Sequence, residues 1–207
     1  KLNKNRSHQI NGDIAVCIAD RLFTGSEHKK QRLLKYHEKY SKDHGKTWNI
    51  STLARTNTTE SQVAEVEPGV LMLNMRDNRG GSRAVSTTTD LGKTWKEHES
   101  SRTALQEPVC MASLISVKAK ENVLGKDILL FSNPNDAKNR HSITIKASLD
   151  GGVTWLPENQ LLLDAGWGWG YSCLTMIDKE TVGILYESSV AHMTFQAIKL
   201  KDIIKTK

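Results

Sequence analysis

An eight-residue pattern that occurs three times constrains the fold of this chain more than any other feature of its sequence. The pattern reads Ser/Thr-x-Asp-x-Gly-x-Thr-Trp and occupies residues 41–48, 88–95 and 148–155. Asp can bond nearby backbone N–H groups, Gly can adopt positive φ, and Trp can pack a turn onto its own sheet. Each copy therefore predicts a tight structural turn. A catalytic or calcium-binding role is the alternative, but one chemical site in every repeat is harder to justify than one turn.

The spacing of the three copies predicts the architecture. Asp43, Asp90 and Asp150 lie 47 and 60 residues apart, which suits one four-stranded propeller blade for each copy. Short runs rich in β-branched and aliphatic residues fill the intervals between turn residues. The expected strands are residues 13–19, 32–40, 61–66, 70–76, 109–117, 127–132, 142–148, 172–177, 181–187 and 193–199. The sequence therefore predicts an all-β chain, with blades that begin near residues 8, 60, 107 and 170.

Composition and charge exclude several classes of function. The chain has 207 residues, of which 38% are hydrophobic and 25% charged, so it resembles an ordinary globular domain rather than a disordered or membrane-spanning segment. The formal net charge of +6 could suit nucleic acid. However, the lysines are scattered, and no helix-turn-helix, zinc-finger or RNA-binding signature accompanies them. We therefore expect a basic, solvated surface and no nucleic-acid partner.

The cysteines and the first residues carry little functional information. Cys17, Cys110 and Cys173 lack the close pairs of a zinc site or a disulfide-stapled domain. We expect them to be buried thiols, and we expect no metal and no cofactor. Residues 1–8 are charged and polar where a signal peptide needs a continuous apolar stretch, so no cellular address can be read there.

Residues 164–174 contain three glycines and two tryptophans, which alternate directly before Tyr171. Glycines at 166, 168 and 170 allow backbone conformations that are closed to other residues, and they let a ligand approach closely. Because an apolar, strand-like run follows at residues 172–177, Tyr171 is expected to open a strand beside a loop. This stretch alone leaves two interpretations open, a reactive tyrosine or an ordinary glycine-rich turn with a half-buried tyrosine.

The repeat resembles the Asp-box of sialidases, the six-bladed propeller enzymes that remove terminal sialic acid, although other Asp-box proteins exist. Four further segments narrow the resemblance, because they match the order and type of the sialidase catalytic motifs. They are Asn57-Thr-Thr-Glu-Ser-Gln-Val-Ala-Glu-Val66, Leu73-Asn-Met-Arg76, Asn139-Arg140 and Gly170-Tyr-Ser-Cys-Leu174. The resemblance runs from about residue 38 to the C-terminus and is weaker before it.

The resemblance implies a retaining mechanism with Tyr171 as the nucleophile and Glu60 as the base that takes its proton. A neutral phenol approaches the reacting carbon without repulsion from the carboxylate that sialic acid carries there, but it needs a base. Arg76 and Arg140 are the expected carboxylate-binding residues, since each guanidinium can form paired, charge-assisted N–H bonds. Glu65 and Glu67 are nearby alternative bases, but Glu65 lies five residues along and strand alternation points it to the other side of the strand from Glu60. We expect both to be structural or exposed.

A division of the chain into blades, made without reference to the family, places these four residues on one face. Glu60 and Tyr171 lie at the starts of innermost strands, Arg76 lies at the end of a second strand, and Arg140 lies just before a third. Because neighbouring strands run antiparallel, these ends meet on the same face of a propeller. The three Asp-boxes lie at the ends of third strands and are therefore expected on the opposite face.

Two catalytic elements of the family are not found. Sialidases have a first carboxylate-binding arginine in an Arg-Ile-Pro context and an aspartate that acts as general acid and base. Arg21 lacks the Ile-Pro context, and Asp43 is already committed to an Asp-box turn. Four blades can be counted where six are expected. We therefore interpret residues 1–207 as one partial propeller domain that resembles the C-terminal two-thirds of a sialidase, with reduced or no activity alone and with the absent N-terminal blades as a partner.

Three classes of function follow from these observations. The first is an exo-α-sialidase, or a piece of one, that releases sialic acid from sialylated glycans or glycoproteins; this substrate class favours a secreted or periplasmic location. The others are a non-catalytic Asp-box propeller that binds carbohydrate or protein, and a basic β domain that binds nucleic acid. Tyr171 and Glu60 favour the first class over the second, because a binding module needs no nucleophile and base.

Overall fold

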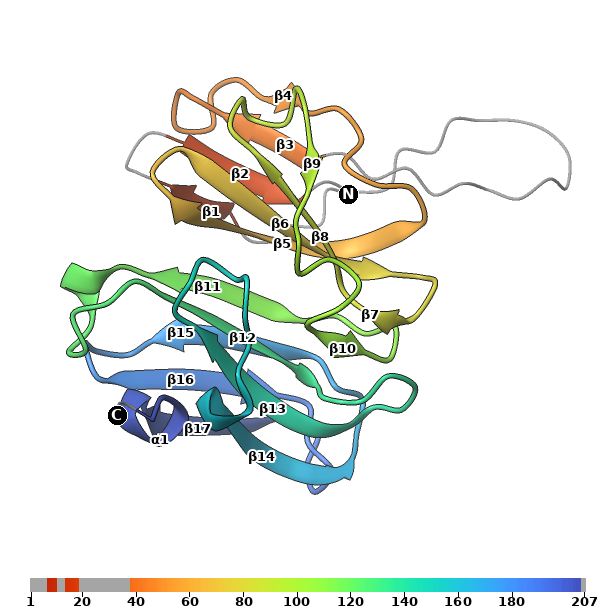
Figure 1. The fold of residues 1–207 in the computed structure, drawn as a ribbon, viewed down its shortest axis with the longest axis vertical. Helices are drawn as coiled ribbons and strands as arrows, with labels where there is room; N and C mark the ends of the chain where they lie inside the picture. The colour runs from red at the N-terminus through yellow and green to blue at the C-terminus, as the bar shows by residue number, and fades with distance from the viewer. Residues whose placement is uncertain (1–6, 11–13, 19–37, 206–207) are drawn as a thin grey trace, which may run out of the picture.

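The computed structural model describes residues 7–10, 14–18 and 38–205, and its regular elements are nearly all β-strands (Figure 1). The earlier strands are β1 (Ser7–Ile10), β2 (Ile14–Ile18), β3 (Glu38–Ser41), β4 (Asn49–Ile50), β5 (Thr58–Glu67), β6 (Val70–Asp77), β7 (Gly81–Ser82), β8 (Ala84–Thr88) and β9 (Lys96–Glu97). The later strands are β10 (Gln106–Glu107), β11 (Ser113–Val117), β12 (Ile128–Pro134), β13 (His141–Ser148), β14 (Gln160–Trp167), β15 (Ser172–Met176), β16 (Thr181–Tyr186) and β17 (Thr194–Lys199). The helices are α1 (Leu200–Ile203) and the 3-10 turns Ala119–Glu121 and Pro157–Asn159, and none in the described residues has the length and apolar character needed to cross a bilayer.

The strands of the described residues form four larger antiparallel sheets. Their orders are β1-β2-β3-β4, β5-β6-β8-β9, β11-β12-β13-β14 and β15-β16-β17, and β7 leaves the second sheet to pair with β10. The first strands of the sheets lie side by side, since β5 contacts both β1 and β11, and β11 contacts β15. Consecutive meanders whose first strands face a common centre have the arrangement of propeller blades.

The apolar core lies between neighbouring sheets. One cluster joins the third and fourth sheets, where Leu130 and Ile145 pack near Val182 and Ile184 with the buried Leu200 of α1. A second cluster joins the second and third sheets, and a third joins the second sheet to Tyr40 of β3. Burial on both faces explains the apolar runs of these strands, since each sheet covers the next.

The Asp-box turns have the geometry that their chemistry predicts. Asp90 Oδ1 accepts from the backbone N of Thr94 at 2.9 Å, and Oδ2 accepts from Thr94 Oγ1 at 2.7 Å. The corresponding bonds recur at Asp43 and Asp150, and Gly92 has a φ of +78°. The bonds from Thr94, together with one from Thr88 Oγ1 to Asp90 Oδ1 at 2.8 Å, lower the pKa of Asp90 to about 2. The turn interpretation is therefore confirmed.

Several strands differ from those expected. The strand β14 and the two-residue strands β4, β7, β9 and β10 were not predicted, because they lack a clear alternation of apolar and polar residues. No expected strand covers β1, although a blade was expected to begin near residue 8. The first expected run, 13–19, corresponds to β2, although residues 13 and 19 lie outside the described residues. Of the expected run 32–40, only the part within β3 is described. The hairpin turn between β5 and β6 is confirmed, with Gly69 at a φ of +79°.

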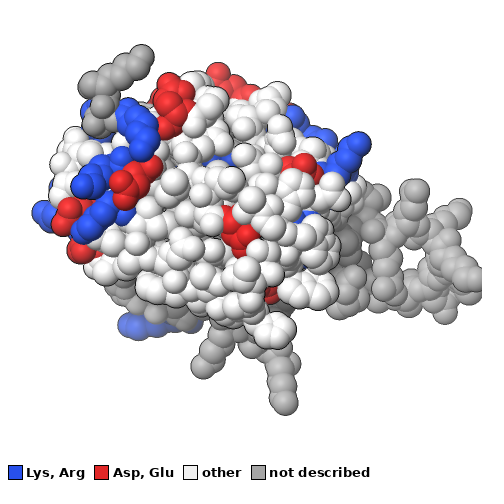
Figure 2. All heavy atoms as spheres, turned by 90° about the horizontal axis from the view of Figure 1, so that it is seen from below, with Lys and Arg blue, Asp and Glu red and all other residues white. Residues whose placement is uncertain are grey.

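The fourth sheet leaves apolar side chains exposed. Leu185 of β16 and Phe195 of β17 are cross-strand partners, and they are 40% and 61% exposed. Figure 2, which views the molecule from the lower end of Figure 1, where β14 and β17 lie, shows a broad area with few charged side chains. Lys, Arg, Asp and Glu gather mainly toward the edges of this face. An uncovered apolar sheet face of this kind marks a surface for interaction.

We predict that Gly92→Ala destabilises the fold more than Gly69→Ala. Both glycines have positive φ, so each alanine should cost about 1–2 kcal/mol in backbone strain. A Cβ at Gly92 would lie 2.5 Å from Ser51 Cβ, whereas a Cβ at Gly69 would meet nothing within 4 Å. The clash should therefore add about 1–3 kcal/mol at Gly92 alone. Urea unfolding of both variants measures the difference, and equal losses would contradict the packing of the Asp-box against Ser51.

Candidate active site

The ends of four strands bring the predicted residues to one face. Glu60 is the third residue of β5, Arg76 is the penultimate residue of β6, Arg140 directly precedes β13, and Tyr171 directly precedes β15. Each Asp-box instead follows the far end of β3, β8 or β13. The predicted separation of the Asp-boxes from the four residues is therefore observed.

Three of the four side chains form a closed hydrogen-bonded cluster. Tyr171 Oη donates to Glu60 Oε1 at 2.5 Å. Arg76 Nη1 donates to Glu60 Oε2 at 2.5 Å and to Tyr171 Oη at 3.2 Å. Both carboxylate oxygens of Glu60 are thus engaged, and the phenol proton faces a carboxylate acceptor.

A β-bulge sets the direction of Glu60. The pairing of β5 with β6 runs from Thr58↔Asp77 to Ser61↔Met75, so one extra residue is inserted on β5 beside Glu60. Bulges bend a strand and re-aim a side chain. Strand alternation therefore could not by itself have fixed the relative directions of Glu60 and Glu65. Glu65 nevertheless has a structural contact, because its Oε1 accepts from Gly69 N at 2.9 Å in the hairpin turn.

The environment keeps the phenol of Tyr171 protonated. Burial, the hydrogen bond to Glu60 and the negative charge of Glu60 raise the pKa of Tyr171 to about 12, although the Arg76 charge opposes them. Burial would lower the pKa of Arg76, but the hydrogen bond and charge of Glu60 outweigh it, so its pKa lies above the ordinary value. Arg76 is therefore a permanent cation beside a neutral phenol. The phenol can react as a nucleophile only when a base removes its proton.

Arg140 lies on the other side of Tyr171 and is held by backbone carbonyl groups. Its Nη1 donates to Trp169 O at 2.9 Å, and its Nη2 donates to Val109 O at 3.0 Å. Its Cζ lies 5.8 Å from the centroid of the Tyr171 ring, within range of a cation–π contact. Arg140 therefore contacts the ring face, whereas Arg76 contacts the hydroxyl.

A buried ion pair that sequence reasoning missed supports the site. Arg83 and Glu107 are both fully buried, and Arg83 Nη1 lies 3.4 Å from Glu107 Oε2. Glu107 also accepts from Asp77 N at 2.9 Å and from Cys110 N at 2.8 Å. These bonds join the end of β6, next to Arg76, to the segment before β11. The available signal was a charged residue, Arg83, directly before the strand β8, and it did not identify the partner.

Glu187 was also missed, and it fixes the backbone of Tyr171. Its Oε2 accepts from Tyr171 N at 2.9 Å, and its own backbone N donates to Tyr171 O at 2.9 Å. The preceding Gly170 has a φ of +87°, and a Cβ there would lie 2.7 Å from Pro134 Cγ. Only glycine fits this approach without rearrangement, so Gly170 and Glu187 together determine where Tyr171 enters β15.

The predicted burial of the cysteines is confirmed for one of the three. Cys110 is a fully buried free thiol beside Gly170, and burial raises its pKa to about 11. Cys173 is only half-buried, so the prediction is wrong there, because it lies on the partly exposed face of the fourth sheet. The side chain of Cys17 lies outside the described residues. The described residues contain no group of three or more His, Cys, Asp or Glu side chains placed to hold a metal.

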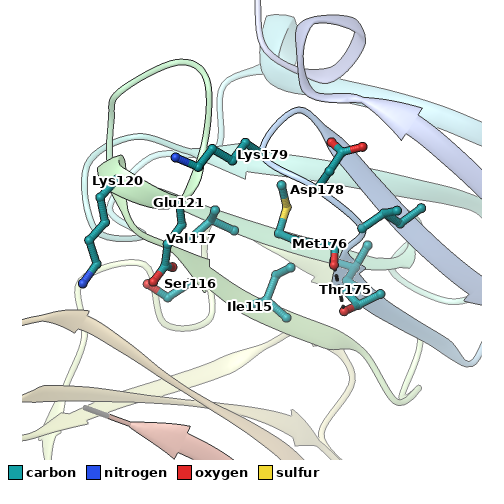
Figure 3. A pocket seen from close by; sticks show the side chains of 11 residues that line it. Ile115, Ser116, Val117, Lys120, Glu121, Thr175, Met176, Asp178 and Lys179 are labelled. Atoms are coloured by element: carbon teal, nitrogen blue, oxygen red, sulfur yellow. Dashed lines mark hydrogen bonds between the residues drawn. The ribbon is translucent and has the colours of Figure 1, made fainter. Parts of the chain in front are cut away.

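A hollow of about 600 Å³ lies away from the cluster. Its lining includes Val117 of β11 and Met176 of β15, both at the ends of their strands (Figure 3). Tyr171 lies at the opposite end of β15. The hollow therefore opens at the face that carries the Asp-boxes, and it does not contain Glu60, Arg76, Arg140 or Tyr171.

Comparisons with known proteins agree with the sequence resemblance. The BNR repeat-like domain family matches residues 2–184. A sialidase of Bacteroides fragilis is 80% identical over 166 residues, which are 80% of this chain and 30% of that protein. A sialidase of Micromonospora viridifaciens is 34% identical over 72% of this chain and 23% of that protein. A solved Hadza microbial sialidase has a TM-score of 0.81 and 72% identity over 84% of this chain and 34% of its own.

Two statements follow from these comparisons. The predicted all-β, sialidase-type propeller fold is confirmed. The chain spans about a third or less of the length of these three relatives.

We predict that Glu60→Gln lowers the pKa of Tyr171. The negative charge of Glu60 raises this pKa, and Gln removes that charge while keeping an oxygen that can accept from the phenol, so the pKa should fall from about 12. Burial remains, so the pKa should stay above its ordinary value. Ultraviolet titration, with Tyr171→Phe to identify the signal, measures the shift, and the exposed Glu67→Gln is the control. An unchanged or higher pKa in Glu60→Gln would contradict the described contact.

Proposed function

The chain belongs to the BNR repeat-like domain family, and we propose that it carries the catalytic face of an exo-α-sialidase. Such an enzyme is a glycoside hydrolase that releases terminal sialic acid from sialylated glycans or glycoproteins. The observation that carries the proposal is the contact of Tyr171 Oη with Glu60 and Arg76, in a chain similar to proteins named sialidases. A non-catalytic carbohydrate-binding propeller would have no need of this contact.

Tyr171 is the proposed nucleophile and Glu60 its base. In the first step, Glu60 Oε1 accepts the phenol proton while Tyr171 Oη forms a bond to the anomeric carbon and the glycosidic C–O bond breaks. In the second step, water attacks the same carbon, the bond from that carbon to Tyr171 Oη breaks, and the phenolate takes back its proton from Glu60. The proton that the water loses balances the negative charge of the departed leaving group, and the two displacements together retain the anomeric configuration. The 2.5 Å contact between Tyr171 and Glu60 suits direct proton transfer.

Arg76 and Arg140 are proposed to bind the carboxylate of sialic acid. A guanidinium has five N–H donors. Arg140 uses two nitrogens to hold backbone carbonyls, which orients the side chain and leaves donors for a ligand. Arg76 lies beside Tyr171 Oη, so its charge would also stabilise the negative charge that develops there when Glu60 takes the proton.

We assign no residue of this chain to the protonation of the glycosidic oxygen of the leaving group. In the described residues, Tyr171 Oη contacts Glu60 and Arg76, and no aspartate joins the cluster. Asp43 accepts from Thr47 in its Asp-box turn, at the end of β3 away from the site. We therefore propose that this chain alone acts poorly on substrates whose leaving group needs an acid.

The apolar face of the fourth sheet is proposed to pack against a further blade of the same propeller. Leu185 and Phe195 are exposed there, and an uncovered apolar sheet face is a liability for aggregation. The Hadza sialidase that this chain matches is about three times as long as the matched part. Additional blades would cover the face and could supply the missing acid and a further arginine.

We predict that the purified chain hydrolyses aryl sialosides slowly and natural sialyl-galactose linkages far more slowly. An aryl group leaves with little protonation, whereas a sugar alkoxide needs an acid, whose absence should cost about 10²–10⁴-fold in rate. The rates are measured by release of the aryl chromophore and of free sialic acid. Comparable turnover of both substrates would show that an acid is present in this chain.

We predict that Tyr171→Phe lowers the hydrolysis of aryl sialosides by about 10³-fold or more, because the nucleophile is lost. Tyr186→Phe is the matched control, since its hydroxyl accepts from Gln196 away from the cluster. Equal losses in the two variants, or full activity in Tyr171→Phe, would refute the proposed role of Tyr171.

A further inference from the structure

Trp167 and Trp169 are large apolar side chains that lie in solvent beside the candidate active site. Each is 63% exposed. Their ring centroids are 6.4 Å apart and their planes meet at 56°. Exposed indoles in close proximity mark a binding surface more often than a structural element. Their place in the chain, four and two residues before Tyr171, links this surface to the proposed reaction.

The local sequence forces both indoles to the same side. Alternate residues of an extended segment point to opposite sides, so Gly166 and Gly168 face away from the two indoles. A Cβ at Gly166 would lie 2.4 Å from Ser189 Cβ, and a Cβ at Gly168 would lie 3.0 Å from Ser188 O. The inner side therefore has room for glycine alone. The Gly-Trp-Gly-Trp-Gly pattern presses the backbone against residues 187–189 and presents the indoles outward.

The segment that carries the indoles is held firmly in place. Asp164 accepts hydrogen bonds from Ser189 N at 2.7 Å, from Ser189 Oγ at 2.7 Å and from Gly166 N at 2.8 Å. Burial would raise the pKa of Asp164, but these bonds outweigh it and the pKa lies below its ordinary value. Gly168 N also donates to Arg140 O at 2.9 Å. A ligand would therefore meet a preformed surface, and the protein would lose less conformational entropy on binding.

This surface is continuous with the residues proposed to bind sialic acid. The carbonyl of Trp169 accepts from Arg140 Nη1 at 2.9 Å, and Arg140 lies over the ring of Tyr171. A sialic acid with its anomeric carbon at Tyr171 and its carboxylate at Arg140 must direct the next sugar toward the rim of the site. Because the carbonyl of Trp169 is bonded to Arg140 and both indoles lie within four residues of Tyr171, we place the two indoles at that rim.

We propose that Trp167 and Trp169 form a platform on which the neutral hexose that carries the sialic acid stacks; this inference rests on the proposed function. One face of a hexose such as galactose consists mainly of C–H bonds with slightly positive hydrogens, and it complements the negative π face of an indole. A cationic ligand would also suit an indole, but Arg140 beside the platform would repel it. The platform would thus favour glycosides with a sugar in the leaving position.

The test compares three ligands in a Tyr171→Phe background, in which bound substrate is not turned over. They are 3′-sialyllactose, the unsaturated analogue of free sialic acid, which has no leaving sugar, and lactose, which has no sialic acid. We expect Trp169→Ala and Trp167→Ala each to weaken sialyllactose binding about fivefold to tenfold, and to leave binding of the analogue unchanged. Phe195→Ala, which removes an equally exposed aromatic ring from β17, should change neither.

Two results would overturn the platform. Sialyllactose affinities that are unaffected by either tryptophan substitution would show that the leaving sugar does not use the indoles. Equal losses for sialyllactose and the analogue would show that the indoles act on sialic acid or on the fold instead.

Lactose separates the platform from the proposed function. Its binding is followed by NMR through the indole N–H signals, which are assigned by Trp→Phe substitution. We expect lactose to shift the signals of Trp167 and Trp169 and to leave that of Trp48 unchanged. If the analogue and sialyllactose fail to bind, the proposed function fails; shifts from lactose would then still support a neutral-sugar platform. Absence of shifts at both indoles would overturn the platform, whatever the other ligands do.

Discussion

One hydrogen bond, from Tyr171 Oη to Glu60 Oε1, joins two sheets that are not neighbours. Glu60 belongs to the sheet of β5 and Tyr171 opens the sheet of β15, with the sheet of β11 between them in the chain. Such a contact requires that the three sheets fan around a common centre, with the same ends of their first strands converging. The meander topology and the packing of apolar side chains between sheets provide this arrangement. The chemistry of the site therefore depends on the relative placement of whole blades.

The buried pair of Arg83 and Glu107 illustrates how the fold maintains that placement. Removing two charges from water costs several kcal/mol for each ion, roughly as much as their attraction returns, so such a pair is weak evidence for stability. Its geometric effect is clearer, because Glu107 binds the backbone next to Arg76 and the backbone of Cys110 at once. The pair thus aligns the second and third sheets at the end where the candidate site lies. Truncation of either partner would leave an unpaired buried charge there.

Features that depend on local chemistry could be predicted from the sequence, whereas those that depend on distant contacts could not. The Asp-box turns follow from the hydrogen-bonding capacity of Asp and the positive φ of Gly. The meeting of Glu60, Arg76 and Tyr171 follows from strand order and antiparallel pairing. The bulge that aims Glu60 and the support from Glu107 and Glu187 depend on partners far away in the chain, which no pattern of neighbouring residues reveals. Cys173 was misplaced for the same reason, because its exposure depends on what covers the fourth sheet.

The central claim, that Tyr171 attacks the anomeric carbon, is tested most directly by trapping the covalent product. A 2,3-difluorinated sialic acid should lose fluoride from its anomeric carbon and form a covalent bond to the nucleophile. This intermediate should hydrolyse slowly, because fluorine beside the anomeric carbon destabilises a cationic transition state. Digestion and mass spectrometry of the treated protein should place one added sugar on Tyr171, and Glu60→Gln should slow the labelling. Labelling of Glu60 or of another carboxylate, with Tyr171 unmodified, would contradict the account.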